Sequence, residues 1–150
     1  MVERAEGIAG AFIVATTGGI SPVVLISLSE GRSLPIYIGL WEAISIGSAL
    51  RGESPPRPFT HDLFAEALKK FNITLTGVYI DSLQDGVYYA TLHLSQENRT
   101  TQLDARPSDG IALALRCGAP ISVDDNVIAA AAVRKSDLPD LADLEDYLNT

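Results

Sequence analysis

Polar residues that can do chemistry crowd together in the segment "LDARPSDGIALALRCGAP", residues 103–120. They are Asp104, Arg106, Ser108 and Asp109, and an almost wholly apolar stretch follows them. A strand that runs directly into a helix would gather these side chains at the junction, where Pro107 suits the first helical turn. Carboxylates in such a place can hold a divalent cation through their oxygens, and such an ion assists phosphodiester hydrolysis.

Two other segments supply residues of matching chemistry. His61 lies at the start of an expected helix, on its apolar face, so we expect a shielded imidazole that serves as general base or ligand. Glu42 offers a further carboxylate. Arg57 and Arg106 would hold phosphate oxygens, because the guanidinium fork pairs with them in a bidentate manner.

These residues together predict one polar pocket. Catalytic roles are expected for Asp104, Asp109, His61 and Glu42. Phosphate binding is expected for Arg57, Arg106 and Ser108. The expected cation ligands, for Mg²⁺ or Mn²⁺, are Asp104, Asp109 and Asp62, and no organic cofactor is expected.

A purely structural role would explain the same cluster. An ion pair of Arg106 with Asp104 or Asp109 would tie the strand to the helix. Ser108 or Asp109 would satisfy free N–H groups of the first turn. No P-loop, GxGxxG, HExxH or CxxC motif is present, so spacing alone leaves both interpretations open.

The elements that must position these residues predict an α+β fold, with a mixed or antiparallel β-sheet, several short helices packed on it and a single compact domain. Strands are expected over 9–17, 23–29, 33–39, 74–82, 87–95, 100–105 and 119–125. Helices are expected over 41–50, from an N-cap at Thr60 to about Phe71, over 107–117 and over 126–133. In the strand 100–105, Leu103 and Ala105 should point inward.

The C-terminal residues predict a separate element. The sequence divides into a domain over 1–135 and an acidic helical appendage over 136–150. In that appendage a stripe of leucines would dock on the body or on a partner: Leu138, Leu141, Leu144 and Leu148.

The composition limits the function classes. Of 150 residues, 47% are hydrophobic and 20% charged, as in a soluble globular protein. The net charge of −8 provides no basic field for tight duplex binding, so contacts with RNA or DNA should be weak. The single cysteine, Cys117, suits a reducing cytoplasm. The apolar stretch from Ile8 to Leu28 is broken by "TTGGISP", which favours two strands over a membrane span.

Three motifs carry a family resemblance. The segments "LPIYIGLWEAISIGSAL", "PPRPFTHDLFAEAL" and "LDARPSDGIALALRCGAPISV" occur in this order, and together they resemble the bifunctional nuclease domain family from about Leu34 to Val133. The resemblance implies a compact α+β domain, often dimeric, that cuts both RNA and DNA. The polar positions of its motifs fall on Glu42, Arg57, Thr60, His61, Asp62, Asp104, Arg106, Ser108 and Asp109. Gly110 departs from the alanine that is more frequent in the family.

Two functions follow as expectations. The first is a cytoplasmic nuclease that hydrolyses phosphodiester bonds in RNA and DNA, chiefly in single-stranded or flexible substrates. The alternative is a non-catalytic homo-oligomeric binding or assembly module in which the Arg-Asp cluster is structural. The leucine stripe and the β-rich first third of the chain predict a homodimer or larger assembly, with no membrane association.

Overall fold

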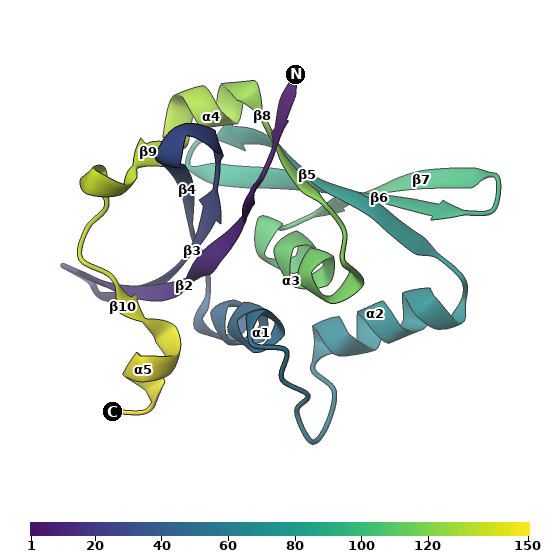
Figure 1. Ribbon diagram of the computed structural model, residues 1–150, viewed down its shortest axis with the longest axis horizontal. Helices are drawn as coiled ribbons and strands as arrows, with labels where there is room; N and C mark the ends of the chain where they lie inside the picture. The colour runs from purple at the N-terminus through teal and green to yellow at the C-terminus, as the bar shows by residue number, and fades with distance from the viewer.

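The computed structural model describes residues 1–150 and has an α+β fold with two five-stranded sheets (Figure 1). In the mixed sheet the strand order is β1 (Val2–Arg4), β8 (Ile121–Asp124), β5 (Thr74–Gln84), β6 (Val87–Gln96) and β7 (Arg99–Ala105). Only β5 and β8 run parallel. The antiparallel sheet has the order β10 (Ala142–Asp143), β2 (Gly7–Thr16), β3 (Gly19–Ser27), β4 (Arg32–Tyr37) and β9 (Val133–Arg134).

Three helices of eleven residues each lie together on one side of the mixed sheet (Figure 1). They are α1 (Leu40–Leu50), α2 (Thr60–Lys70) and α3 (Pro107–Cys117). The apolar helix α3 is central, because it packs on β5 and β6 and contacts both α1 and α2. The short helices α4 (Asp125–Ala131) and α5 (Leu144–Leu148) and the 3₁₀ turns Ser29–Gly31 and Lys135–Asp137 complete the chain.

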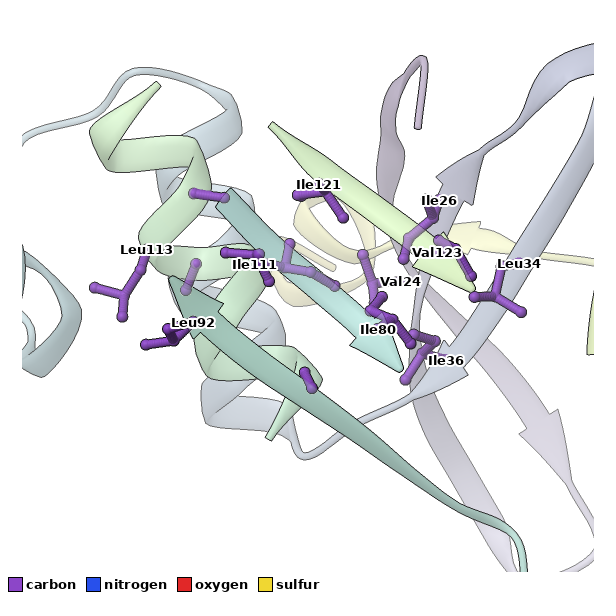
Figure 2. Packing of buried hydrophobic residues seen from close by; sticks show 14 of the residues in the cluster. Val24, Ile26, Leu34, Ile36, Ile80, Leu92, Ile111, Leu113, Ile121 and Val123 are labelled. Carbon is purple, nitrogen blue, oxygen red and sulfur yellow. The ribbon is translucent and has the colours of Figure 1, made fainter. Parts of the chain in front are cut away.

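One core joins the two sheets to α3. Alternate residues of β3 and β4 point toward residues of β5, β8 and α3 in Figure 2. The labelled side chains include Val24, Ile26, Leu34, Ile36, Ile80, Ile111 and Val123, each at most 2% exposed. Full burial of each such side chain stabilises the fold by about 1.5–3 kcal/mol. The start of α3 is therefore fixed by packing along the rest of that helix.

The predicted fold class and most predicted elements are confirmed, with ends that shift by one to a few residues. The turn between β5 and β6 shows why an element can be predicted from local sequence. Asp85 and Gly86 have φ of 52° and 78°, and a two-residue hairpin turn that matches the strand twist requires positive φ at both positions. The Asp-Gly pair therefore fixes this hairpin locally.

One local prediction is wrong, and one holds only in part. The N-cap of α2 is Phe59, not Thr60, and the Asp62 carboxylate accepts a hydrogen bond of 2.8 Å from the Phe59 N–H. Leu103 points to the same face as its buried partner Leu92, as predicted, but it is 40% exposed because β7 is an edge strand.

The C-terminal tail is also not the single helix expected. Pro139 interrupts it, and only Leu144–Leu148 is α-helical. Of the two alternatives for the leucines, docking on the body is observed. Leu144 is buried against Ala11, Ile13 and Ala43, and β10 pairs with β2. Leu138 and Leu141 pack on a small cluster that contains Val14, Val23 and Leu25, whereas Leu148 is exposed.

The apolar stretch from Ile8 to Leu28 forms β2 and β3, as expected. Among the helices, none has both the length and the apolar character needed to cross a bilayer.

Gly110 has a packing reason that the sequence does not show. A Cβ at this position would lie 2.7 Å from Cγ1 of the fully buried Val78 on β5. We expect Gly110→Ala to lower the free energy of unfolding by about 1–2 kcal/mol, because overpacking exceeds the gain in helix propensity of roughly 1 kcal/mol. Urea denaturation measures the change.

The pair Gly110→Ala and Val78→Ala provides the control. The two substitutions together should cost less than the sum of the single ones, by about 1 kcal/mol or more, because the added methyl fills space that Val78 vacates. Additive costs would contradict the contact.

Candidate functional site

The starts of α1, α2 and α3 surround one open hollow of about 530 Å³, which we call the helix-end hollow. Its lining residues are Trp41, Glu42, Ile44 and Ser45 of α1, Pro58 and Phe59 before α2, Thr60 and His61 of α2, and Arg106 and Asp109 at the start of α3. Three separate segments of the sequence therefore contribute to it, because α1 and α2 both pack against α3.

The backbone at the hollow favours anions. The N-cap residues Gly39, Phe59 and Arg106 provide no side-chain hydrogen bond to their helices. The N–H groups of a first helical turn lack partners within the helix, and the helix dipole places partial positive charge there. One acidic residue in each first turn offsets part of this field: Glu42, Asp62 and Asp109. The field is therefore local and moderate.

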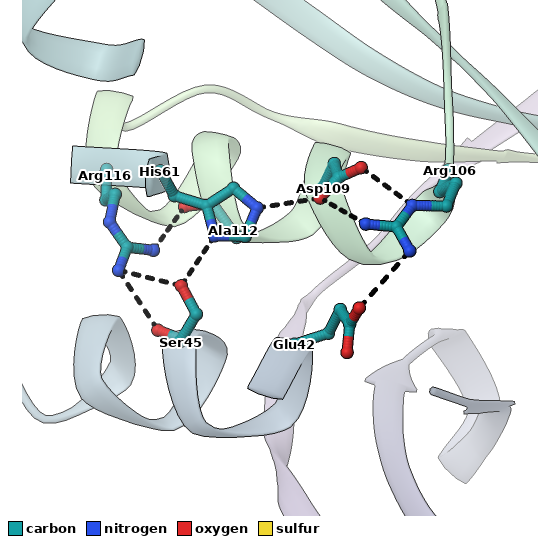
Figure 3. A network of polar contacts seen from close by, with 7 residues as sticks. All are labelled: Glu42, Ser45, His61, Arg106, Asp109, Ala112 and Arg116. Carbon is teal, nitrogen blue, oxygen red and sulfur yellow. Dashed lines mark hydrogen bonds and ion pairs between the residues drawn. The ribbon is translucent and has the colours of Figure 1, made fainter. Parts of the chain in front are cut away.

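His61 is held at both ring nitrogens (Figure 3). Its Nε2 lies 2.8 Å from Oδ1 of Asp109, and its Nδ1 lies 2.6 Å from Oγ of Ser45. An ionised carboxylate only accepts, so in the neutral imidazole Nε2–H donates to Asp109 and the Ser45 hydroxyl donates to Nδ1. The His61 side chain is 14% exposed, which confirms the expected shielding.

Arg106 links two carboxylates at the other end of the hollow (Figure 3). Its Nε donates to Oδ2 of Asp109 at 3.0 Å, its second amino group to Oδ1 of Asp109 at 3.2 Å, and its first to Oε1 of Glu42 at 3.3 Å. Burial opposes ionisation of Asp109, but the hydrogen bonds from Arg106 and His61 outweigh it and lower the pKa of Asp109. The same hydrogen bond to Asp109 raises the pKa of Arg106.

Arg116 closes the contacts on the far side of His61. Its Nε donates to Oδ1 of Asp62 at 2.7 Å, and one amino group donates to Oγ and to the backbone oxygen of Ser45 at 3.1 and 3.2 Å. The other donates to the backbone oxygen of Ala112 at 3.0 Å. This side chain is only 9% exposed. A continuous polar network thus runs Glu42–Arg106–Asp109–His61–Ser45–Arg116–Asp62 across the three helices.

Ser45 and Arg116 were absent from the residues expected from the sequence. A helical spacing could have found them. Ser45 follows Glu42 by three positions and Arg116 follows Asp109 by seven, so each shares a helix face with an expected site residue. Their types gave no reason for selection, because a serine and an arginine within apolar helices also serve in packing.

The structure gathers some of the expected site residues and separates others. Glu42, His61, Arg106 and Asp109 line the helix-end hollow, together with Thr60 of the family motif. The expectation of one pocket for all eight residues is wrong in part. Arg57 is exposed in the loop before α2 and lines no part of the hollow, and Asp104 is exposed on β7 opposite Thr91.

The remaining two expected residues lie nearby but face elsewhere. Ser108 is 5% exposed and lines an adjacent hollow that shares Glu42 and Arg106 with the first. The carboxylate of Asp62 accepts hydrogen bonds from the Phe59 N–H and from Arg116. Burial opposes ionisation of Asp62, but those hydrogen bonds outweigh it and lower its pKa.

Comparison with known proteins identifies the family. The profile of the bifunctional nuclease domain matches residues 23–136. The chain belongs to this family. It is 42% identical over 125 residues to an uncharacterized protein of Mycobacterium tuberculosis, covering 83% of this chain and 73% of that protein.

Plant proteins of the bifunctional nuclease family are more distant. The similarity to Bifunctional nuclease 1 of Oryza sativa subsp. japonica is 29% identity over 109 residues, which covers 69% of this chain and 33% of the plant protein. Bifunctional nuclease 2 of the same plant is 26% identical over 118 residues, covering 75% and 36%. The chain therefore spans about a third of each of these plant proteins.

The carboxylates of this family member do not form a cation site in the observed arrangement. Asp104 is exposed on β7, Asp62 is paired with Arg116, and both oxygens of Asp109 already accept hydrogen bonds from Arg106 and His61. No group of three or more His, Cys, Asp or Glu side chains is placed to hold a metal ion. The positive charge between Glu42 and Asp109 is the guanidinium of Arg106. A role for Mg²⁺ or Mn²⁺ stays a prediction.

Ser45, His61 and Asp109 have the order of a Ser-His-Asp triad, but the serine is not presented as a nucleophile. Ser45 is 5% exposed and its hydroxyl also accepts a hydrogen bond from Arg116. Its position suits an orienting group that fixes the imidazole of His61. The exposed guanidinium of Arg106 and the ring of His61 are then the groups that can act on a bound substrate.

The lowered pKa of Asp109 predicts acid sensitivity. A carboxyl group whose pKa falls on folding stabilises the fold above its unfolded value, near 3.9, and that stability is lost as the pH drops through the folded value. We expect the free energy of unfolding of the native chain to decrease below about pH 4. Urea titrations between pH 7 and pH 3 should show a shallower decrease for Asp109→Asn.

Asp104→Asn is the matched control, because Asp104 is exposed and has no hydrogen-bond partner among the side chains. It should retain the acid dependence of the native chain. Equal acid dependence in Asp109→Asn and the native chain would remove Asp109 from this role.

Proposed function

We propose that this protein is a nuclease that hydrolyses phosphodiester bonds in RNA and DNA, acting on single-stranded or flexible substrates. One observation carries the proposal. The exposed Arg106 and three helix starts without side-chain caps share an open hollow with the His61–Asp109 pair. The names of the plant relatives, Bifunctional nuclease 1 and 2, support it.

In this proposal the phosphate binds at the helix starts. Arg106 is 66% exposed, so its first amino group can exchange Glu42 for a phosphate oxygen while Nε and the second amino group stay on Asp109. Guanidinium groups and helix N-termini are both suited to phosphate oxygens. Since the whole chain carries a charge of −8, affinity must come from this local field, and modest affinity is expected.

His61 transfers the proton. A water molecule attacks the phosphorus atom, the bond to one ester oxygen breaks, His61 takes a proton from the water, and the departing oxygen takes a proton from solvent. Asp109 holds the ring in one tautomer and stabilises the imidazolium that forms. For this step Nδ1 of His61 exchanges its contact with Ser45 for the reacting group, while Nε2 stays on Asp109, as catalytic hydrogen bonds tighten only with substrate bound.

The test compares cleavage with stability. His61→Ala should reduce cleavage of an unstructured RNA or DNA oligonucleotide by about 10²–10⁴-fold, the usual contribution of a general acid or base. Arg106→Ala should also reduce it. Asp104→Asn, in the same segment but outside the hollow, should retain native activity. Each variant is assayed with and without a chelator, which tests the role of a divalent cation separately.

A non-catalytic assembly module is the second candidate, and one observation favours it. Every fully buried side-chain polar atom already has a hydrogen-bond partner within the chain, so the network satisfies itself without a ligand. In that case His61→Ala and Arg106→Ala would lower the melting temperature, and the native chain would leave the oligonucleotide intact. Lost cleavage with nearly unchanged melting favours the nuclease.

We also propose a homodimer or larger assembly. The tail leucines no longer support it, because three of them pack on the body. The outer face of α2 does, since Leu63 is 62% and Phe71 is 70% exposed. Light scattering at roughly tens of micromolar should give at least twice the monomer mass of 16.0 kDa. A monomer at that concentration would contradict the assembly.

A further inference from the structure

Two aromatic side chains, Trp41 and Phe59, line the helix-end hollow beside its polar residues. Trp41 lies in the first turn of α1, directly before Glu42, and is 78% exposed. Phe59 is the N-cap residue of α2, two positions before His61, and is 37% exposed. Both line the hollow together with Arg106 and Asp109. Neither is needed for the polar network described above.

No aromatic side chain of the chain belongs to the buried core, and Trp41 is the most exposed of them. A tryptophan side chain can bury a large apolar area, and here most of that area faces solvent beside a group suited to phosphate. A lone exposed apolar residue needs no explanation. Here, however, two aromatic residues at the starts of different helices share one hollow with an exposed arginine. The hollow therefore combines aromatic ring faces with a guanidinium group.

From this combination we propose that Trp41 and Phe59 form a stacking platform for an unpaired nucleobase whose neighbouring phosphate lies on Arg106. Aromatic side chains stack on bases, and arginine tracks the backbone, in proteins that bind single strands without sequence preference. The hollow, about 530 Å³, lies within the range of small-ligand pockets and accommodates one nucleotide. The inference deepens the proposed nuclease function and rests on it for the identity of the ligand.

The charge of the chain selects the single strand over the duplex. In a duplex the ring faces of the bases are covered by their neighbours, and protein contacts depend mainly on the phosphate backbone. A chain with a net charge of −8 gains little from that backbone. Stacking on Trp41 does not depend on net charge, so it can supply affinity that phosphate contacts do not supply in this acidic chain.

Trp41 is the only tryptophan of the chain, so its emission reports on this position alone. A short oligothymidylate with phosphorothioate linkages, which resist hydrolysis, is titrated into the native full-length chain. We expect saturable quenching of the Trp41 emission. An abasic oligonucleotide of the same length and a duplex of the same sequence should quench it far less.

Phe59→Ala should raise the apparent Kd for the oligothymidylate by about tenfold, the usual order for loss of one stacking contact. Tyr89→Ala is the matched control. Tyr89 is an aromatic residue on β6 with similar exposure, 42%, and it lies outside the hollow. It should leave both the quenching and the Kd unchanged. Melting curves of both variants show whether each remains folded.

The outcomes separate this inference from the proposed activity, because cleavage of an unmodified oligonucleotide is measured in the same preparation. Quenching without cleavage supports the platform and contradicts the nuclease. Cleavage without quenching overturns the platform and leaves the nuclease intact. Equal quenching by the abasic strand or by the duplex overturns it too, since the base would then not be what Trp41 contacts. Absence of both signals overturns both.

Discussion

The site depends on the hydrogen bonds that the carboxylate of Asp109 accepts. It accepts two hydrogen bonds from Arg106 and one from His61, so it joins the start of α3 to α2 and, through Arg106, to Glu42 on α1. Its partial burial would favour the neutral acid, yet these donors lower its pKa. A carboxylate that is held ionised fixes the tautomer of His61 and the orientation of Arg106 at the same time.

This arrangement makes architecture and chemistry difficult to separate. The network connects three helices that also pack together, since α1 and α2 each contact α3. Close helix packing brings the polar side chains within hydrogen-bond distance. The same contacts that hold the helices then position the groups at the hollow. A stability measurement must therefore accompany every activity measurement on these residues.

The two halves of the network differ in exposure. Arg116 is nearly buried and binds Asp62, Ser45 and a backbone oxygen, so its donors are committed to the helix junction. Arg106 is mostly exposed, and it can turn one edge toward a ligand without unpairing Asp109. The two arginines at opposite ends of α3 thus take different roles, because only Arg106 lies at the open end.

The sequence by itself determined the fold class, most elements and the segments that meet at the site. Those features are local: hydrophobic period, the Asp-Gly turn at 85–86, proline at the start of α3, and three motifs of a known family. It also selected Glu42, His61, Arg106 and Asp109, because the chemistry of those residue types is visible without coordinates. It did not select Ser45 or Arg116, whose importance comes only from what lies across the helix junction.

Only the tertiary structure decided which residues share the hollow. Asp104 and Arg106 are two positions apart and were expected to act together, but the chain leaves the edge strand β7 between them, so Asp104 stays exposed while Arg106 turns toward Asp109 and Glu42. The tail leucines repeat with a helical period, yet Pro139 and pairing with β2 place three of them on the body. In both cases the outcome depends on long-range packing, which short-range spacing does not encode.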